Sequence, residues 1–477
     1  MSAVTFPGFL AATKGFVAEV RPSSKYATAD PMVGRSRMRR TSWRPRALVV
    51  RSGLTFISSL VIVLGSTLAV DPTGVGATSP ADQGVTSTTI RVGFPVINFP
   101  ALAVVGVHLN DGNFQDAISA LTAYMNAHGG IDGRRIVPFV ALDDPALTAS
   151  SLAVCTQLTE DDHVFIVMAP VYPDCYQGTH DTPVIAGTLP GTLPANAAPD
   201  FSLTPPDEAY DPIQFAAFKT AGVFKGKKVG IYYGSGVDAP EAKLVQSDLK
   251  RLHVDVVQFA GNDAPPTDTA AVDEDTQTIA LRFKSEGVNE VVAVGGSGAT
   301  DWPRALNNLQ VTYKPPWIAT NYTSISSDVA AAKGGNPYYD NVMTSDPAPS
   351  TYQAWQDPAI QKCYRIVHKA YPSDPISPPP NPNTPAAASD SSNATYAAVA
   401  SVCVTLAVLA AIADHAGKDL TVASFTKAGY GLRNVTLPGS MEPVSFAPNE
   451  PYVLGTPHLL VYSVKLGTLV PASTRVG

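Results

Sequence analysis

The strongest constraint on the fold is a stretch in which a strand pattern, a helix pattern and a second strand pattern follow one another. Apolar residues alternate with polar or small ones from Ile90 to Pro95, as in a strand that is leaving a sheet. From Phe114 to Met125 they recur at spacings of four, three and four, which places one apolar stripe on a helix. Gly129-Gly130 ends that helix, because glycine adopts the left-handed backbone of a C-cap. The mostly apolar run from 136 to 142 then suits a parallel strand covered on both faces.

The same alternation continues along the chain and predicts a doubly wound α/β fold in two lobes. In the first lobe we expect a helix at 148–160 and strands at 164–169 and 184–186. The proline-rich segment 187–212 is interpreted as a crossing to the second lobe. There we expect helices at 215–221, 239–252, 279–286 and 305–309 and strands at 228–233, 254–259, 291–294 and 317–319.

The opening unit resembles a known family. Residues Asn126 to Arg134 (NAHGGIDGR) match the wording Asn-x-x-Gly-Gly-Ile-Asn-Gly-Arg of the leucine/isoleucine/valine-type periplasmic binding proteins, with Asp132 in place of the second Asn. The acidic pair Asp143-Asp144 also follows the next strand at the family's spacing. These proteins are type I solute receptors of ABC transporters.

The resemblance implies two doubly wound parallel-sheet lobes joined by a multi-strand hinge, which close on a ligand like a Venus flytrap. It implies capture of a small organic solute, such as a branched-chain amino acid or an amide, for an ABC permease. It implies no catalysis and no cofactor, and we expect a monomer. The predicted division is an N-terminal extension with signal or anchor and tether (1–77), lobe one (78–205), lobe two (206–335), a return to lobe one (336–455) and a C-terminal hinge strand and tail (456–477).

Charge and the N-terminal region restrict the location and the partners. Of 33 basic and 40 acidic residues, ten and three lie in residues 1–77, so the rest of the chain carries a net charge of −14. Such a body repels phosphate backbones, which argues against nucleic acid as a partner. Five arginines between 39 and 51 precede the apolar run 54–70, as in a secretory signal peptide. Retention of this run as a membrane anchor is the alternative, and the chain would then be a membrane-anchored ligand sensor with the same fold. Met38 is an alternative start.

Four cysteines are present in the 477 residues. An even number in an exported chain favours disulfides over free thiols. Proximity in sequence favours Cys155 with Cys175 and Cys363 with Cys403, although three pairings are formally possible. No Cys-x-x-Cys or paired histidine spacing supports a metal site.

Two later segments need an interpretation. Residues 372–393 are rich in proline and serine and predict a surface loop. The run from 396 to 413 is apolar over 18 residues, the short limit for a membrane span. Its alanines, together with Ser401, Cys403 and Thr405, favour a buried helix of lobe one over a spanning helix. We interpret 458–464 as a strand that recrosses the hinge.

Sequence motifs for catalysis and nucleotide binding are weak. Ser297 in GGSGA resembles a Gly-x-Ser-x-Gly nucleophile elbow, but Ala299 replaces the last glycine. Asp301 and His415 are unconvincing partners for it, so we favour a loop over an exported hydrolase. The glycines form neither a dinucleotide fingerprint nor a phosphate loop.

Ligands of open parallel sheets bind beyond the carboxyl ends of the strands, and the family's ligand contacts come from the same loops. The candidate ligand-binding residues are therefore Phe94, Pro95, Pro170, Val171, Tyr172, Gly187 and Thr188 in lobe one, and Tyr233, Gly234, Ser235, Gly296, Ser297, Asn321 and Tyr322 in lobe two.

One loop departs from the family's pattern. Amino-acid receptors of the family have a Ser/Thr-rich loop after the third strand, whereas this chain has MAPVYPDC, in which Asp174 is the clearest acidic partner for an amino group. A less polar ligand stacked on Tyr172, Tyr233 or Tyr322 fits as well. For each tyrosine, packing within its own loop is the alternative.

Overall fold

The structure is a computed structural model. It describes residues 83–104, 110–144, 147–170, 172–186, 198–234, 236–265, 268–309, 313–322, 325, 337–348, 351–379, 381, 394–440, 442–463 and 468–472. The predicted signal or anchor segment, all of 1–77 and most of the insert 372–393 lie outside these residues.

Lobe one is built on a five-stranded parallel sheet with the order β2-β1-β3-β4-β5. Its strands are β1 (Thr89–Ile97), β2 (Arg135–Asp143), β3 (Ile166–Met168), β4 (Val184–Ile185) and β5 (Asp200–Phe201). The predicted βαβ unit is confirmed, but β1 runs two residues past Pro95. Strand β3 pairs with β1 only at Val92 and Gly93, so Pro95, which has no N–H to donate, lies where β1 has a partner on one side.

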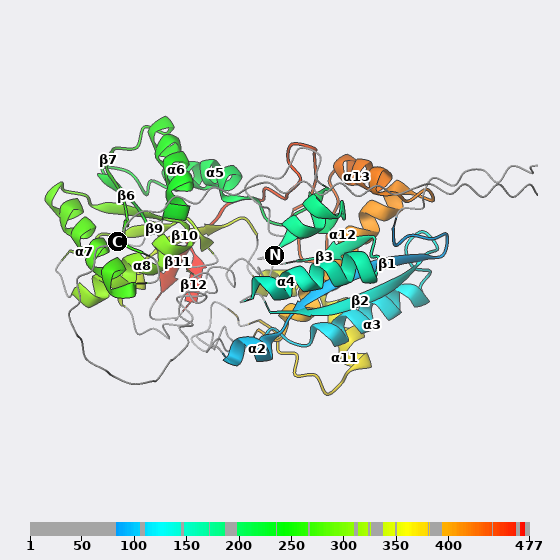
Figure 1. The fold of residues 1–477 in the computed structure, drawn as a ribbon. Helices are drawn as coiled ribbons and strands as arrows, with labels where there is room; N and C mark the ends of the chain where they lie inside the picture. The colour runs from blue at the N-terminus through cyan, green and yellow to red at the C-terminus, as the bar shows by residue number, and fades with distance from the viewer. Residues whose placement is uncertain are drawn as a thin grey trace, which may run out of the picture. The chain divides into compact units, whose positions relative to one another are not determined.

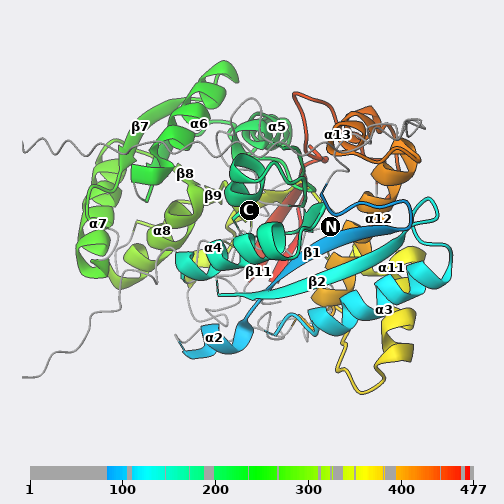
Figure 2. The same cartoon turned by 45° about the vertical axis from the view of Figure 1, so that its right-hand side comes forward.

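Helices cover both faces of this sheet (Figure 1). They are α2 (Phe99–Val104), α3 (Phe114–Ala127), α4 (Thr148–Thr156), continued by the turn η1 (Gln157–Asp161), η2 (Cys175–Thr179), α10 (Thr351–Trp355), α11 (Pro358–Ala370), α12 (Ala397–Ala416) and α13 (Val422–Gly431). On one face α3, α11 and α12 share the main core with Ile90, Val92 and Phe94. On the other, α4 and η1 pack over Ala141 and Val167. Figure 2 shows α3 running along β1 and β2 with α11 beside it.

Helix α12 is long and apolar enough to cross a membrane, yet 67% of that stretch is buried inside the protein. Val408, Leu409 and Ile412 are completely enclosed by the core of lobe one. The structure thus agrees with the predicted core helix. Helix α13, which the sequence analysis missed, begins with a capping box in which Thr421 and Ser424 each accept a hydrogen bond from the other's backbone N–H.

Lobe two is built on a seven-stranded sheet with the order β12-β11-β10-β9-β8-β6-β7. Its strands are β6 (Val229–Tyr233), β7 (Val256–Gly261), β8 (Glu290–Val294), β9 (Trp317–Ala319), β10 (Met343–Asp346), β11 (His458–Ser463) and β12 (Thr468–Pro471). Strands β6 to β10 are parallel, whereas β11 is antiparallel to both β10 and β12.

Two predicted boundaries are corrected by this sheet. Residues from 336 onward were assigned to lobe one, but β10 pairs with β9, so lobe one resumes only after Asp346. The strand at 458–463 was assigned to the hinge, but it lies between β10 and β12. Met343 of β10 pairs with Ile318 of β9, 25 residues earlier, and with Val461 of β11, 118 residues later. A local sequence pattern does not identify the partners of a strand, so neither pairing was predicted.

The helices of lobe two also cover both faces of their sheet (Figure 1). They are α5 (Asp207–Thr220), η3 (Gly236–Asp238), α6 (Ala239–Arg251), α7 (Thr269–Ser285), α8 (Gly295–Leu309) and η4 (Pro337–Tyr339). Phe215 of α5 and Leu249 of α6 pack on one face, and Phe283 of α7 and Trp302 of α8 on the other. Helices α7 and α8 begin ten residues earlier than predicted.

Three segments connect the lobes and lie side by side. Ser202, just after β5, donates its backbone N–H to Pro451 O at 2.9 Å and accepts from Val453 N at 3.0 Å. A Cβ on Gly455 would lie 2.0 Å from Pro347 O, so these two segments are in direct backbone contact. The predicted multi-strand hinge corresponds to these crossings.

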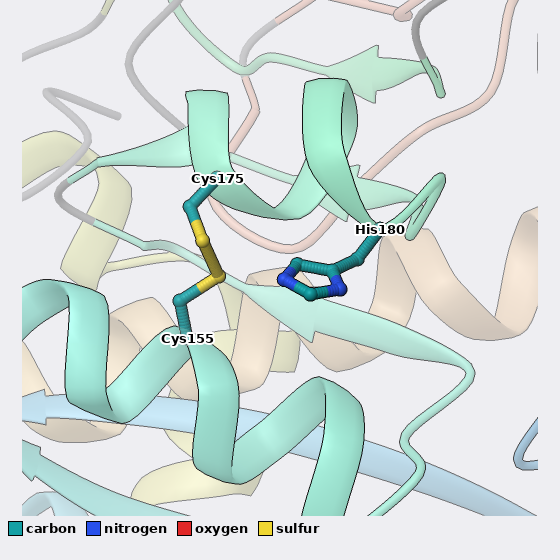
Figure 3. Close-up of side chains that lie close together, drawn as sticks. All are labelled: Cys155, Cys175 and His180. Carbon is teal, nitrogen blue, oxygen red and sulfur yellow. A yellow bond between two sulfur atoms is a disulfide. The ribbon is translucent and has the colours of Figure 1, made fainter. Parts of the chain in front are cut away.

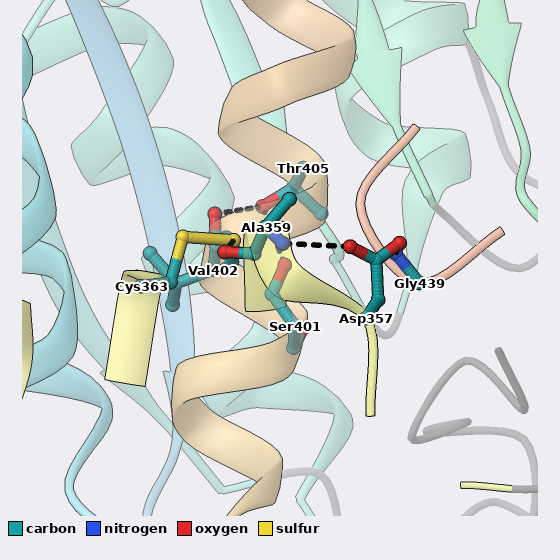
Figure 4. The surroundings of a disulfide bond; sticks show 8 residues. Asp357, Ala359, Cys363, Ser401, Val402, Thr405 and Gly439 are labelled. Atoms are coloured by element: carbon teal, nitrogen blue, oxygen red, sulfur yellow. Dashed lines mark hydrogen bonds between the residues drawn. A yellow bond between two sulfur atoms is a disulfide. The ribbon is translucent and has the colours of Figure 1, made fainter. Parts of the chain in front are cut away.

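Both favoured disulfides are present. Cys155–Cys175 joins α4 to η2, with the His180 ring beside it (Figure 3). Cys363–Cys403 joins α11 to α12. Next to it, Asp357 caps α11 by accepting from Ala359 N at 2.6 Å, and it also accepts from Gly439 N at 2.7 Å (Figure 4).

Candidate functional site

The predicted loops after β6, β8 and β9 of lobe two meet at the carboxyl ends of their strands. A Cβ on Gly234 would lie 2.5 Å from the carbonyl carbon of Ser297. Gly295 donates its N–H to Thr320 Oγ1 at 2.9 Å. The structure thus brings three of the predicted ligand loops of lobe two together, including Gly234, Gly296 and Ser297 and, directly after Thr320, Asn321.

Glycine is required at the start of α8 for two reasons. Gly295 has a φ of +73°, a left-handed backbone that other residues rarely adopt. A Cβ there would also lie 2.5 Å from Asp238 Cγ. The close approach lets Ser297, in the first turn of α8, donate its hydroxyl to the Asp238 carboxylate.

Four carboxyl groups surround these loops, and we call Asp207, Asp211, Asp238 and Glu241 the acidic cluster. Thr320 Oγ1 donates to Glu241 Oε1 at 2.9 Å. Gln214 Nε2 donates to Asp211 Oδ1 at 2.5 Å and to Thr320 O at 3.4 Å. A chain of hydrogen bonds therefore joins α5, the end of β9 and the first turn of α6.

The electrostatics of the acidic cluster favour protons or cations. Burial and neighbouring carboxylates raise the pKa values of Asp211 and Glu241 well above their usual range. Asp207 is solvent-exposed, so water screens its charge, whereas Asp211 is fully buried. Asp211 is therefore the carboxylate whose charge is most costly to hold.

The acidic cluster was not among the predicted ligand-binding residues. Asp207 and Asp211 stand one helical turn apart in the first two turns of α5, and Glu241 lies in the first turn of α6. The available signal was the acidic sequence Asp207-Glu208 followed by Asp211, directly after two prolines.

The predicted lobe-one residues are less accessible than expected. Phe94 is 3% exposed and belongs to the hydrophobic core, and Pro95 and Pro170 are buried. Phe94 and Pro95 do not stand in an open loop, because β1 extends beyond the predicted end. Pro170 follows β3 and is buried as well. Tyr172 is partly exposed, and burial and then the Asp143 carboxylate raise its pKa. Val171, Gly187, Thr188 and Ser235 lie outside the described residues.

The lobe-two tyrosines differ from each other. The Tyr233 ring lies 5.3 Å from that of Phe259 between centroids, and a Cβ on Gly261 would be 1.9 Å from it. This ring therefore packs across β7, as the alternative interpretation expected. Tyr322, with Asn321, is partly exposed beyond β9.

The partners that a catalytic Ser297 would need are elsewhere. Asp301 pairs with Arg304 at 2.8 Å. His415 lies on α12 in lobe one, and a Cβ on Gly431 would be 3.5 Å from its Nε2. Within the described residues, the one trio of side chains close enough to share a metal ion is Cys155, Cys175 and His180. The two sulfurs of this trio are bonded to each other (Figure 3).

Comparison with known proteins shows similarity at the level of structure. No protein-family model matches the chain, and no curated protein matches it by sequence. An ABC transporter substrate-binding protein from Desulfitobacterium hafniense, solved in complex with Leu, is similar with a TM-score of 0.53 and 13% identity, over 81% of this chain and 99% of that one.

Two further solved structures are similar over comparable lengths. A possible leucine/isoleucine/valine-binding protein from Rhodopirellula baltica SH 1 has a TM-score of 0.53 and 11% identity, over 83% of this chain and 98% of that one. A fatty acid ABC transporter substrate-binding protein from Thermomonospora curvata has a TM-score of 0.52 and 16% identity, over 82% and 92%. The chain therefore has the two-lobed fold of the type I periplasmic binding proteins, as the resemblance implied.

Proposed function

We propose that the protein is an extracytoplasmic solute receptor that captures a small organic ligand between its lobes for an ABC importer. The observation that carries this proposal is the meeting of the loops after β6, β8 and β9 at the carboxyl ends of the lobe-two strands. Ligands of open α/β sheets bind at such ends. We place the ligand against the partly exposed residues Ser297, Asn321 and Tyr322, with Tyr172 on the side of lobe one.

The hinge supports a receptor that works by closing. Three adjacent crossing segments allow the lobes to rotate without disrupting either core, as in hinge-type domain closure. A ligand shifts the open and closed populations only by its difference in affinity for the two states. Closure is then the signal that a permease recognises.

Two observations support export. The protein contains the disulfides Cys155–Cys175 and Cys363–Cys403, and disulfides form and persist in oxidising compartments outside the cytoplasm. The arginines and the apolar run of the N-terminal region supply an export signal. We propose that the protein acts as a monomer outside the cytoplasm, with its permease as the membrane partner.

The test is a thermal-shift screen of the full-length chain. Amino acids, amides, short-chain and aromatic acids, fatty acids and polyamines are tested separately. A ligand at 100 times its dissociation constant stabilises the fold by about 2.7 kcal/mol. We expect stabilisation by one chemical class, accompanied by a decrease in the radius of gyration in solution scattering.

The screen also separates the rival functions. Stabilisation by no class would contradict the receptor function. Ester hydrolysis that Ser297→Ala abolishes would instead favour an exported hydrolase, although the positions of Asp301 and His415 do not support one.

A further inference from the structure

Two other buried carboxylates of lobe two have basic partners. Glu290, which is fully buried, pairs with Lys227 at 3.6 Å, and Asp301 pairs with Arg304 at 2.8 Å. Within the described ranges, no lysine or arginine forms an ion pair with Asp207, Asp211 or Glu241. The cluster thus brings several carboxyl groups together at the site proposed for the ligand.

A second observation points to a missing donor. Asp211 is 0% exposed, and its Oδ1 accepts a hydrogen bond from Gln214. Its Oδ2 is buried and has no hydrogen-bond partner. A buried polar atom without a partner costs free energy, and a buried charge costs more. A donor from a ligand would remove this cost.

The spacing of the carboxyl groups argues against a single metal ion. Among the described residues, the metal-compatible trio is the cysteine and histidine group in lobe one, and no three members of the acidic cluster qualify. The carboxylates instead extend from α5 across η3 to α6. An elongated ligand whose charges are separated along its length fits such an arrangement better than a point charge.

Solvent can reach one side of the cluster. Asp207 is exposed, and Asp238 and Glu241 are partly exposed, whereas Asp211 is fully enclosed. A ligand that arrives from solvent therefore meets Asp207, Asp238 and Glu241 before Asp211. An ammonium group carries three donors, enough for Asp211 Oδ2 and a second carboxylate.

We propose that the solute of this receptor is an organic cation with at least two ammonium groups, of the polyamine class, held by the acidic cluster with Asp211 and Glu241 as its innermost partners. This inference rests on the proposed receptor function and assigns its substrate class. The partly exposed Tyr322 gives a methylene chain an apolar surface to lie on.

The experiment is isothermal titration calorimetry of the full-length chain with spermidine and, separately, with leucine. The variants are Asp211→Asn and Glu241→Gln, which keep the shape of each side chain and remove its charge. Matched controls are Asp255→Asn and Glu286→Gln, both on exposed residues of lobe two. Thermal unfolding of each variant without ligand verifies the fold, and the second cluster variant serves if one fails to fold.

We expect spermidine to bind the unmodified chain and both control variants equally. Each cluster variant should raise the dissociation constant at least tenfold, and raising the salt from 0.05 to 0.5 M should weaken binding, since salt screens charge pairs. Spermidine binding that the cluster variants leave unchanged would overturn the assignment. Binding of leucine but not spermidine would also overturn it while the receptor function stood. Binding of neither compound, together with no stabilisation in the wider screen, would overturn both.

Discussion

The closest backbone approach in the candidate site is at Gly234, and it can be tested with one added methyl group. In Gly234→Ala the new Cβ would lie 2.5 Å from the carbonyl carbon of Ser297 and 2.7 Å from Gly298 N. Ordinary contacts of a Cβ are 3.4 to 4 Å. Both neighbours are backbone atoms at the start of α8, so no flexible side chain can move aside. The loops after β6 and β8 must then separate.

The cost follows from this geometry. Overpacking of a close-packed region destabilises a protein by about 1–3 kcal/mol. The matched control is Gly236→Ala, two residues along the chain, where an added Cβ meets nothing within 4 Å. The φ of Gly236 is also outside the left-handed region. Alanine there reduces the freedom of the unfolded chain and is expected to stabilise by about 0.4–1 kcal/mol.

The assay is urea denaturation followed by tryptophan fluorescence. Trp302 and Trp317 lie in the core of lobe two, so unfolding of that lobe changes the signal, to which Trp355 of lobe one also contributes. We expect Gly234→Ala to have a lower free energy of unfolding than the unmodified protein, and Gly236→Ala an equal or higher one. Equal stability of the two variants, within about 0.5 kcal/mol, would refute the close approach of the two loops.

Three further predictions concern the cores and the charges. Replacing both cysteines of one pair by serine should lower the free energy of unfolding by about 3 kcal/mol for Cys155–Cys175 and about 4 kcal/mol for Cys363–Cys403, whose sequence separations are 20 and 40; urea denaturation checks the order of the two. Leu249→Ala should cost about 2–5 kcal/mol because the side chain is fully buried on α6, whereas Leu244→Ala on the same helix, 43% exposed, should change stability by under about 0.5 kcal/mol; equal effects would contradict the assigned face of α6. Burial raises the pKa of Asp111 from 3.8 to about 6, so the folded state binds its proton more tightly than the unfolded state. The ionised carboxylate therefore lowers the free energy of unfolding above pH 6, and this loss disappears as the pH falls toward 3.8. Asp111→Asn should therefore raise the free energy of unfolding at pH 7.5, measured by urea denaturation, by on the order of 1 kcal/mol given the partial exposure of Asp111. The effect at pH 4 should be small, and a gain of the same size at both pH values would contradict this.

The first βαβ unit was predictable because the residues that determine it are neighbours in the sequence. The apolar stripe from Phe114 to Met125 and the glycines that end the helix are contained in one short stretch, and the structure has α3 where the stripe lies. Helix α12 was also predictable, since its alanines suit a helix packed against neighbours. The two disulfides were predictable because the cysteines of each pair are close in sequence and because an exported chain reaches an oxidising compartment.

The acidic cluster was not predictable, for a physical reason. Asp207 and Glu241 are 34 positions apart, and only the packing of α5 beside α6 brings their carboxyl groups together. The burial of Phe94 was missed because proline normally ends a strand, whereas here β1 continues where β3 no longer pairs with it. Both features depend on which helices and strands are neighbours in the folded protein. The local sequence pattern does not contain this information.

The pairing of β10 with β11 has a consequence for synthesis. The two strands are neighbours in one sheet, yet α10 to α13, which belong to lobe one, lie between them in the chain. Neither lobe is therefore a continuous length of polypeptide. On a ribosome, β10 emerges before its partner β11, so this edge of the lobe-two sheet is unpaired while the helices of lobe one between them are synthesised. Pairings between distant parts of a chain form slowly, and an unpaired strand edge can pair with another chain, so the β10 edge is the place where newly made chains are most exposed to aggregation.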